Sequence, residues 1–208
     1  MQRIKLFVTG IGTDVGKTFV SAALVDALAA DYWKPIQTGS LLVTDSATIR
    51  TLCQKVATIH PESYCLREPL SPHAAAELEG VTICWRTILC PNTDNHLVIE
   101  GAGGLLVPLT YTETLADLIE QLSVPVLLVV RSYLGCINHT LLTIEALRKR
   151  SISIFGIVFV GDQNIQTQRV IQQQSAVLQI VRLPEYHAID REAVNDAAKI
   201  LREWLVHV

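Results

Sequence analysis

The stretch Phe7-Val8-Thr9-Gly10-Ile11-Gly12-Thr13-Asp14-Val15-Gly16-Lys17-Thr18 decides the fold, because a short apolar strand runs directly into a glycine-rich turn that ends in Gly-Lys-Thr. The hydrophobic pattern predicts a buried strand over 4–9 and an apolar helix over 18–30. Backbone N–H groups at the start of such a helix attract anions, since the helix dipole favours negative charge there. The order of strand, glycines, Lys-Thr and helix therefore predicts a phosphate-binding loop.

Two side chains at the end of this loop have the chemistry that a nucleotide needs. Lys17 can reach the terminal phosphates, and Thr18 can place its hydroxyl on Mg²⁺. The spacing departs from the usual G-x4-G-K-[ST], because position 11 is Ile and the nearest upstream glycines are Gly10 and Gly12. The alternative is a structural glycine turn that only connects the strand to the helix.

Length and composition narrow the class of protein. A chain of 208 residues with 50% hydrophobic content can bury a substantial core, and we expect one domain over 1–208. The net charge of −3 argues against nucleic acid as the main partner, because no broad cationic surface is available. The longest apolar runs, such as 124–130, have the length of a strand, so we expect no membrane span. The five cysteines are odd in number and lack paired metal spacing, which favours reduced thiols in a cytoplasmic protein over zinc or disulfides.

Strand-like apolar runs alternate with helical segments along the chain, which predicts an α/β fold with a mostly parallel sheet covered by helices on both faces. The expected strands cover 4–9, 32–37, 96–100, 125–130, 152–160 and 179–182. The expected helices after the first cover 46–57, 114–121, 138–150, 166–178 and 191–206. The region 58–95 contains four prolines and is expected to be a loop with short helices. Ligands of such sheets bind beyond the carboxyl ends of the strands.

Polar residues lie in and after the second expected strand. Lys34 leads into the small-residue turn Thr38-Gly39-Ser40, where it could neutralise charge on a phosphate or a substrate. The alternative is a lysine that extends to solvent from a strand. Asp45 opens the next helix, either as its N-cap or as a Mg²⁺ ligand.

Glu100 ends the expected strand over 96–100 and is followed by Gly101-Ala102-Gly103-Gly104. An acidic residue that terminates an apolar strand near a phosphate loop has the placement of a Walker B carboxylate, and glycines allow close backbone approach to a ligand. The alternative is a carboxylate that caps a nearby N–H, followed by a flexible turn. Thr18, Asp45 and Glu100 together would supply hard oxygen ligands for Mg²⁺.

The segment Leu134-Gly135-Cys136-Ile137-Asn138-His139 precedes an expected helix, so its N–H groups could hold a carboxylate. The alternatives are a plain helix start capped by Asn138 and a Cys136–His139 thiol–imidazole pair. The pair is disfavoured because no further group that would orient it is identifiable.

Together these motifs resemble the dethiobiotin synthetases of biotin biosynthesis. The resemblance covers 4 to about 150 and rests on the phosphate loop, Trp33-Lys34-Pro35, Ser71-Pro72-His73, Glu100-Gly101-Ala102-Gly103-Gly104 and Gly135-Cys136-Ile137-Asn138-His139. The family makes a ureido ring from 7,8-diaminononanoate and CO2 with MgATP, through a carbamate and a carbamic–phosphoric anhydride. The resemblance implies an ATP-dependent ligase with Mg²⁺ as its metal.

The resemblance also implies roles for individual residues. Lys17 and Lys34 would flank the carbamate and the γ-phosphate, with Lys34 at the position that the family counts as its active site. The implied Mg²⁺ ligands are Thr18, Asp45 and Glu100. The implied nucleotide contacts are Asp14, Val15, Gly16, Lys17, Thr18, Phe19, Asp45, Glu100, Gly101, Ala102, Gly103, Pro184, Glu185 and Tyr186. The implied substrate contacts are Thr13, Thr38, Gly104, Gly135, Cys136, Ile137 and Asn138, the last four holding the substrate carboxylate across the interface of a homodimer.

Two departures from the family pattern bear on the nucleotide. Asp14 stands where members often carry Glu, and Val160-Gly161 stands where they often carry an Asn-Asp pair that reads adenine. Asp162, Asn164 or backbone groups near 184–186 are the substitutes for that pair.

Two alternative functions belong to other classes. Another amide-forming synthetase of the same superfamily usually carries a glutaminase domain, for which 208 residues leave no room. A partitioning-type ATPase switch typically has an extra lysine early in its phosphate loop, and residues 10–16 contain none.

Overall fold

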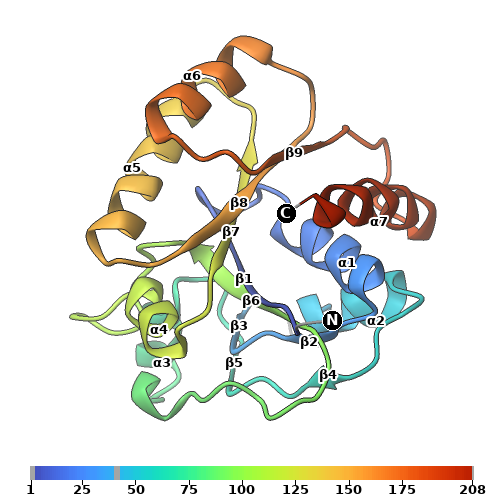
Figure 1. The fold of residues 1–208 in the computed structure, drawn as a ribbon. Helices are drawn as coiled ribbons and strands as arrows, with labels where there is room; N and C mark the ends of the chain where they lie inside the picture. The colour runs from blue at the N-terminus through green and yellow to red at the C-terminus, as the bar shows by residue number, and fades with distance from the viewer. Residues whose placement is uncertain (1–2, 40–42, 208) are drawn as a thin grey trace.

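The computed structural model describes residues 3–39 and 43–207. Within these residues the main sheet has seven strands in the order β4-β2-β6-β1-β7-β8-β9, and every adjacent pair is parallel (Figure 1). The strands are β1 (Lys5–Gly10), β2 (Asp31–Trp33), β4 (Ile59–His60), β6 (Leu97–Gly104), β7 (Val126–Arg131), β8 (Ile154–Val160) and β9 (Ile180–Leu183). The predicted parallel α/β sheet is confirmed.

Helices cover both faces of this sheet, as Figure 1 shows. On one face, three helices pack against the sheet and share an apolar core with it: α1 (Lys17–Leu28), α2 (Asp45–Leu52) and α7 (Arg191–Val206). On the other face, a second apolar core contains residues of α3 (Pro72–Leu78), α4 (Leu115–Leu122), α5 (Cys136–Lys149) and α6 (Ile165–Ser175). A short 3-10 helix, η1, covers Trp85–Thr87. Successive residues of a strand face opposite sides, so Leu6 and Val8 enter one core and Phe7 the other. The middle of a parallel strand buried on both faces is therefore apolar, as 6–8 is.

The prediction of a single strand over 32–37 is wrong, because the structure has two short strands there. The chain leaves the main sheet after β2, and β3 (Ile36–Thr38) pairs instead with β5 (Tyr64–Leu66) in a separate two-stranded sheet. The break falls at Lys34 and Pro35, and proline has no N–H to donate to a ladder. The region 58–95 likewise contributes strands that we did not expect, since β4 forms an edge of the main sheet. Strands of two or three residues are too short to show a periodic pattern.

The expectation that the third strand ends at Glu100 is also wrong, because β6 continues through the glycines to Gly104. A Cβ added at Gly101 would lie 2.7 Å from Leu115 Cδ2 and 2.9 Å from Phe7 Cε1, so a larger residue there would have to displace these core side chains. These contacts contradict a flexible turn at Gly101. Glu100 is therefore held inside a strand, which restricts where its carboxylate can lie.

The helix expected over 46–57 ends earlier, at Leu52. The carboxylate of Asp26 accepts hydrogen bonds from the backbone N–H groups of Gln54 and Lys55, at 2.9 Å each, and these bonds hold the chain outside a helix. Over 3–39 and 43–207, no helix combines the length and apolar character needed to cross a membrane.

Candidate active site

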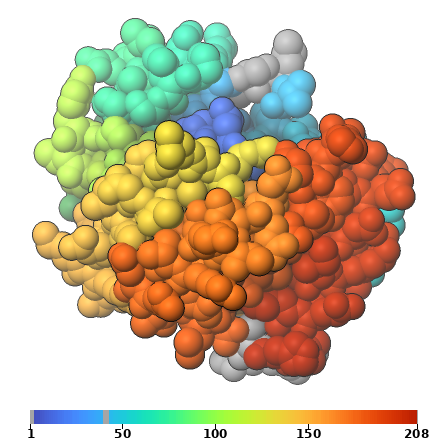
Figure 2. Space-filling view, turned by 90° about the horizontal axis from the view of Figure 1, so that it is seen from above, coloured from blue at the N-terminus to red at the C-terminus, as the bar shows by residue number. Residues whose placement is uncertain are grey.

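A cavity of about 450 Å³ lies where the phosphate loop leaves β1. In the space-filling view the blue N-terminal atoms lie at the bottom of a hollow between the green and cyan segments and the yellow start of α5 (Figure 2). The cavity brings together many of the residues singled out from the sequence: Thr13, Asp14, Gly16, Lys17, Thr18, Phe19, Lys34, Thr38, Asp45, Glu100, Ala102 and Gly103. These residues come from four separated stretches of the chain.

The phosphate loop depends on backbone conformations that few residues adopt. Gly16 caps α1 with a φ of 95°, and a Cβ added there would also lie 3.3 Å from Val160 Cγ1. Asp14 has a φ of 57°, in the left-handed region that Asp enters more readily than most residues. The loop thus places its backbone at the N-terminus of α1, as an anion site requires.

Lys17 is the first residue of α1 and is buried. Its Nζ donates to the backbone carbonyl of Gly12 at 2.9 Å, across the loop. Burial lowers the pKa of Lys17, and the charge of Glu100 only partly offsets that effect. An ammonium with a desolvated charge at this point is well suited to an incoming anion.

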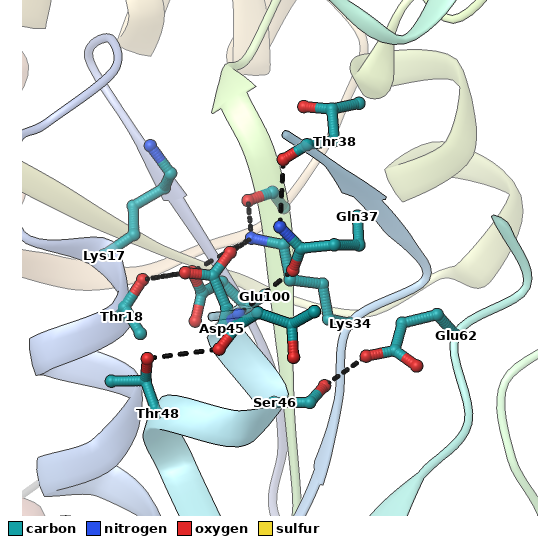
Figure 3. Close-up of polar contacts among 12 residues, drawn as sticks. Lys17, Thr18, Lys34, Gln37, Thr38, Asp45, Ser46, Thr48, Glu62 and Glu100 are labelled. Carbon is teal, nitrogen blue, oxygen red and sulfur yellow. Dashed lines mark hydrogen bonds and ion pairs between the residues drawn. The ribbon is translucent and has the colours of Figure 1, made fainter. Parts of the chain in front are cut away.

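Thr18 and two carboxylates converge beside the loop, as Figure 3 shows. Thr18 Oγ1 lies 2.8 Å from Asp45 Oδ1 and 2.8 Å from Glu100 Oε1. A hydroxyl has one proton, so it can donate to only one of these oxygens at a time. No group of three or more His, Cys, Asp or Glu side chains in the described part of the chain could hold a metal. The hydroxyl and two carboxylates are nevertheless all oxygen donors, which suits Mg²⁺ when phosphate oxygens and water complete its shell.

Lys34 lies against the same two carboxylates. Its Nζ forms an ion pair with Asp45 and another with Glu100 at 3.2 Å, and its exposed fraction is 4%. Burial alone would lower the pKa of Lys34, but the charges of Glu100 and Asp45 outweigh burial and raise it. Burial would raise the pKa of Asp45, but the charge and hydrogen bond of Lys34, together with the Thr18 hydroxyl and the charge of Lys17, lower it. The alternative of a lysine that extends to solvent is therefore wrong; Ser40, in the turn expected after it, lies outside the described residues.

Asp45 is not the N-cap of α2. Thr44 holds that position, and its Oγ1 accepts from the N–H of Ala47 at 3.0 Å. The N–H of Asp45 donates to Gln37 Oε1 at 3.1 Å, which fixes the start of the helix against β3. The Asp45 carboxylate is consequently left to face Thr18 and Lys34.

Three residues around the site were missed from the sequence. Gln37 and Arg131 line the cavity, and the hydroxyl of Tyr32 donates to Glu100 Oε2 at 2.9 Å. Arg131 could have been found, because it directly follows the apolar run 125–130 at the edge where ligands bind. Nothing local in the sequence marks Tyr32, since a tyrosine in a strand is ordinary core material.

The segment 184–186 lies beside the cavity without lining it. Arg131 reaches Glu185 with Nη2 2.5 Å from Oε1, and the ring of Tyr186 packs edge-on against Phe19 with centroids 5.4 Å apart. Asn164 caps α6, where its Oδ1 accepts from the N–H of Thr167 at 2.9 Å. The Asn164 side chain is therefore engaged within its own helix.

The other predicted substrate residues do not join this cavity within one chain. Gly135, Cys136 and Ile137 line a separate cavity of about 350 Å³, and Gly104 lines another with Gly12 and Thr13. Asn138 lies within α5, whose N-cap is Gly135, so the alternative of a helix start capped by Asn138 is wrong. His139 Nδ1 contacts the hydroxyl of Tyr133 at 2.5 Å, and the described residues show no hydrogen bond between the His139 ring and Cys136. Val15 and Gly101 are buried outside the cavity, although the Gly101 carbonyl lies 3.5 Å from Lys34 Nζ.

Comparison with known proteins decides the family. A family model described as an AAA domain matches residues 4–193. A protein of Cytophaga hutchinsonii named ATP-dependent dethiobiotin synthetase BioD is 49% identical over 203 residues, which cover 96% of this chain and 98% of the relative. One of the same name from Nitrobacter hamburgensis is 47% identical, over 93% of this chain and 92% of the relative. The chain belongs to the family of ATP-dependent dethiobiotin synthetases. Membership confirms the resemblance inferred from the sequence and the expectation of a ligase.

Solved structures are similar in fold at low sequence identity. The cell division ATPase MinD of Pyrococcus furiosus has a TM-score of 0.59 at 16% identity, over 98% of this chain and 99% of that one. A ParA family ATPase of Chlorobium tepidum has a TM-score of 0.54 at 13% identity, over the full length of both chains. These likenesses confirm the P-loop NTPase-like fold. They carry no argument for a partitioning function.

Proposed function

We propose that this chain joins CO2 to 7,8-diaminononanoate with MgATP and closes the ring to give dethiobiotin, ADP and phosphate. The observation that carries the proposal is the cluster of Lys17, Thr18, Lys34, Asp45 and Glu100 around one cavity, in a member of this family. The cluster supplies both of the charges that such a reaction needs, cations for phosphate and carbamate and carboxylates for a metal.

The reaction has three steps. One amine nitrogen attacks CO2 and loses a proton, which gives a carbamate. A carbamate oxygen then attacks the γ-phosphorus of ATP, and the bond to the β-phosphate oxygen breaks to release ADP. The second amine attacks the carbonyl carbon of this anhydride and loses a proton as phosphate departs. Phosphoryl transfer of this kind depends mainly on positioning and charge neutralisation by the protein.

The residues of the cavity divide this work by position. Lys17 and the backbone N–H groups of 13–18 bind the β- and γ-phosphates, and Lys34 faces the carbamate and the transferring phosphoryl group. Thr18, Asp45 and Glu100 would hold Mg²⁺, which would neutralise phosphate charge. Thr13 and Thr38 lie on the cavity wall, where their hydroxyls can hydrogen-bond the diamine or the carbamate.

The carboxylate end of the substrate belongs, in this proposal, to Gly135–Asn138 of a second copy. The start of α5 presents backbone N–H groups, which suit a carboxylate. Tyr133, Leu134 and Ile137 are exposed by 43%, 103% and 36% beside it, and a homodimer would bury them. In a single chain these residues line a cavity separate from that of the phosphate loop.

A direct assay tests the proposal. The protein is incubated with diaminononanoate, bicarbonate and MgATP, and dethiobiotin is sought by mass spectrometry. We expect product with one ADP per ring, and a loss of turnover of roughly 10²-fold or more in both Lys17→Ala and Lys34→Ala. Absence of product from the unaltered protein, or near-normal turnover in Lys34→Ala, would refute it.

A further inference from the structure

The two carboxylate oxygens of Glu100 have different partners. Oε1 lies 2.8 Å from Thr18 Oγ1 and 3.2 Å from Lys34 Nζ, on the side of the cavity. Oε2 accepts the hydroxyl proton of Tyr32 at 2.9 Å. Tyr32 is fully buried and does not line the cavity. Its hydroxyl therefore reaches the site only through Glu100.

The sheet places these two side chains together. Strands β2 and β6 are parallel neighbours, with Tyr32 opposite Val98. Glu100 follows Val98 by two residues, so all three side chains lie on the same face of the sheet. The ring of Tyr32 packs in the same core as Val98 and α1. Because that packing holds the ring, the hydroxyl has a fixed position under Glu100.

A buried carboxylate needs such a partner. Glu100 is 1% exposed, so an oxygen without a hydrogen bond would remain desolvated. Without the Tyr32 hydroxyl as a donor, the Glu100 side chain would satisfy the desolvated oxygen by turning both carboxylate oxygens toward Lys34 and Thr18. The hydroxyl of Tyr32 opposes that rotation, because it keeps Oε2 on the core side and Oε1 on the cavity side.

We propose that Tyr32 is a positioning residue that sets the orientation of Glu100 and thereby the affinity of the site for Mg²⁺. The inference rests on the proposed function in one respect, since it takes Glu100 to be a ligand of Mg²⁺. Groups that orient the ligands of a metal typically change its affinity by about 10–100-fold when they are removed. A strand residue with no contact to nucleotide or substrate would thus control how tightly the metal is held.

The test is Tyr32→Phe, which keeps the ring and removes only the donor. Mg²⁺ is titrated by calorimetry into the complex of the protein with ADP, and ADP is titrated separately in excess EDTA. We expect Mg²⁺ to bind at least about 10-fold more weakly, with the affinity for ADP in EDTA unchanged. Tyr64→Phe is the matched control, because the Tyr64 hydroxyl accepts a hydrogen bond from the Cys84 N–H at 2.9 Å, away from the cavity. It should leave the affinity for Mg²⁺ unaltered.

A double-mutant cycle with Glu100→Gln separates positioning from general damage to the fold. If Tyr32 acts through Glu100, Tyr32→Phe weakens Mg²⁺ binding in the unaltered protein and has little further effect beside Glu100→Gln. An equal loss in both backgrounds, or in Tyr64→Phe, overturns the inference. Unchanged Mg²⁺ affinity in Tyr32→Phe, with a loss in Glu100→Gln, also overturns it and leaves the proposed function intact. Unchanged affinity in Glu100→Gln removes the metal role of Glu100 itself and so counts against both.

Discussion

Loss of charge should destabilise the fold much more at Lys34 than at Lys17, the two buried lysines of the cavity. Lys34 forms ion pairs with Asp45 and Glu100, and those charges raise its pKa despite burial. Among the described residues, Lys17 has no carboxylate within ion-pair distance, and burial lowers its pKa. Lys34→Met should therefore destabilise the fold strongly, whereas Lys17→Met should not. Methionine keeps an unbranched side chain of similar length in both places.

The magnitudes follow from the contacts. Removing one partner of a buried ion pair costs about 3–5 kcal/mol, because the remaining charge stays buried without compensation. Two unit charges 4 Å apart at an effective dielectric constant near 20 attract by about 4 kcal/mol, which is the same scale. The Asp45 side chain is 27% exposed, so we expect the lower end, about 3 kcal/mol, for Lys34→Met. Lys17→Met removes one hydrogen bond and one desolvated charge, which offset each other to within about 1 kcal/mol.

The assay is urea unfolding followed by circular dichroism, in EDTA and in excess Mg²⁺. The free energy of unfolding should fall by about 3 kcal/mol for Lys34→Met in EDTA. Mg²⁺ should restore part of this loss, since a ligand of the folded state stabilises it and a divalent cation can replace the missing ammonium between the carboxylates. Equal destabilisation by the two substitutions, or a larger loss for Lys17→Met, would refute the reasoning. So would a loss for Lys34→Met that Mg²⁺ does not reduce.

Three further predictions concern other contacts. Glu100→Gln should require more Mg²⁺ for half-maximal turnover, because it keeps the shape and removes the charge; an unchanged Mg²⁺ titration would assign Glu100 a structural role. With Val160-Gly161 at the base-reading position and Asn164 engaged as a helix cap, GTP and CTP should support kcat/KM within about 100-fold of ATP, and a far stronger preference that Asn164→Ala abolishes would contradict this. Asp31 is buried, but hydrogen bonds from Thr93, His60 and Asn95 hold its pKa below the ordinary 3.8. The ionised Asp31 carboxylate therefore contributes its full stabilisation above pH 3.8. This stabilisation is lost as the pH falls through the lower pKa that Asp31 has in the folded protein. Asp31→Asn should cost about 1–3 kcal/mol in urea unfolding at pH 7 and progressively less as the pH falls below 4, whereas a difference constant with pH would show that its charge is irrelevant.

Much of the fold could be predicted from the sequence because its signals are local. The run 6–8 is apolar although its side chains face both sides of the sheet, and the glycines and Lys-Thr follow within 10–18, so strand, loop and helix are encoded in one short stretch. The alternation of such runs with helices was enough to predict a parallel sheet with two covered faces. Glu100 at an expected strand end, and Lys34 in a strand that breaks into a turn at the edge of the phosphate loop, also predicted that these two side chains would lie near that loop.

What only the tertiary structure decided depends on pairs of residues far apart in the chain. Tyr32 meets Glu100 across 68 positions because β2 lies beside β6, and strand order is not contained in any local pattern. The division of 32–37 into β2 and β3 likewise depends on β5, which is only three residues long and offers a partner to β3. Burial of Lys34 also depends on tertiary structure. From the sequence alone a lysine in a strand could also extend to solvent, whereas in the fold two carboxylates from other elements form ion pairs with it. Local sequence determined the longer strands and helices, because their hydrophobic periodicity is short-range. Packing determined which short strands form and which charges meet, because both depend on how the strands are ordered in the sheet.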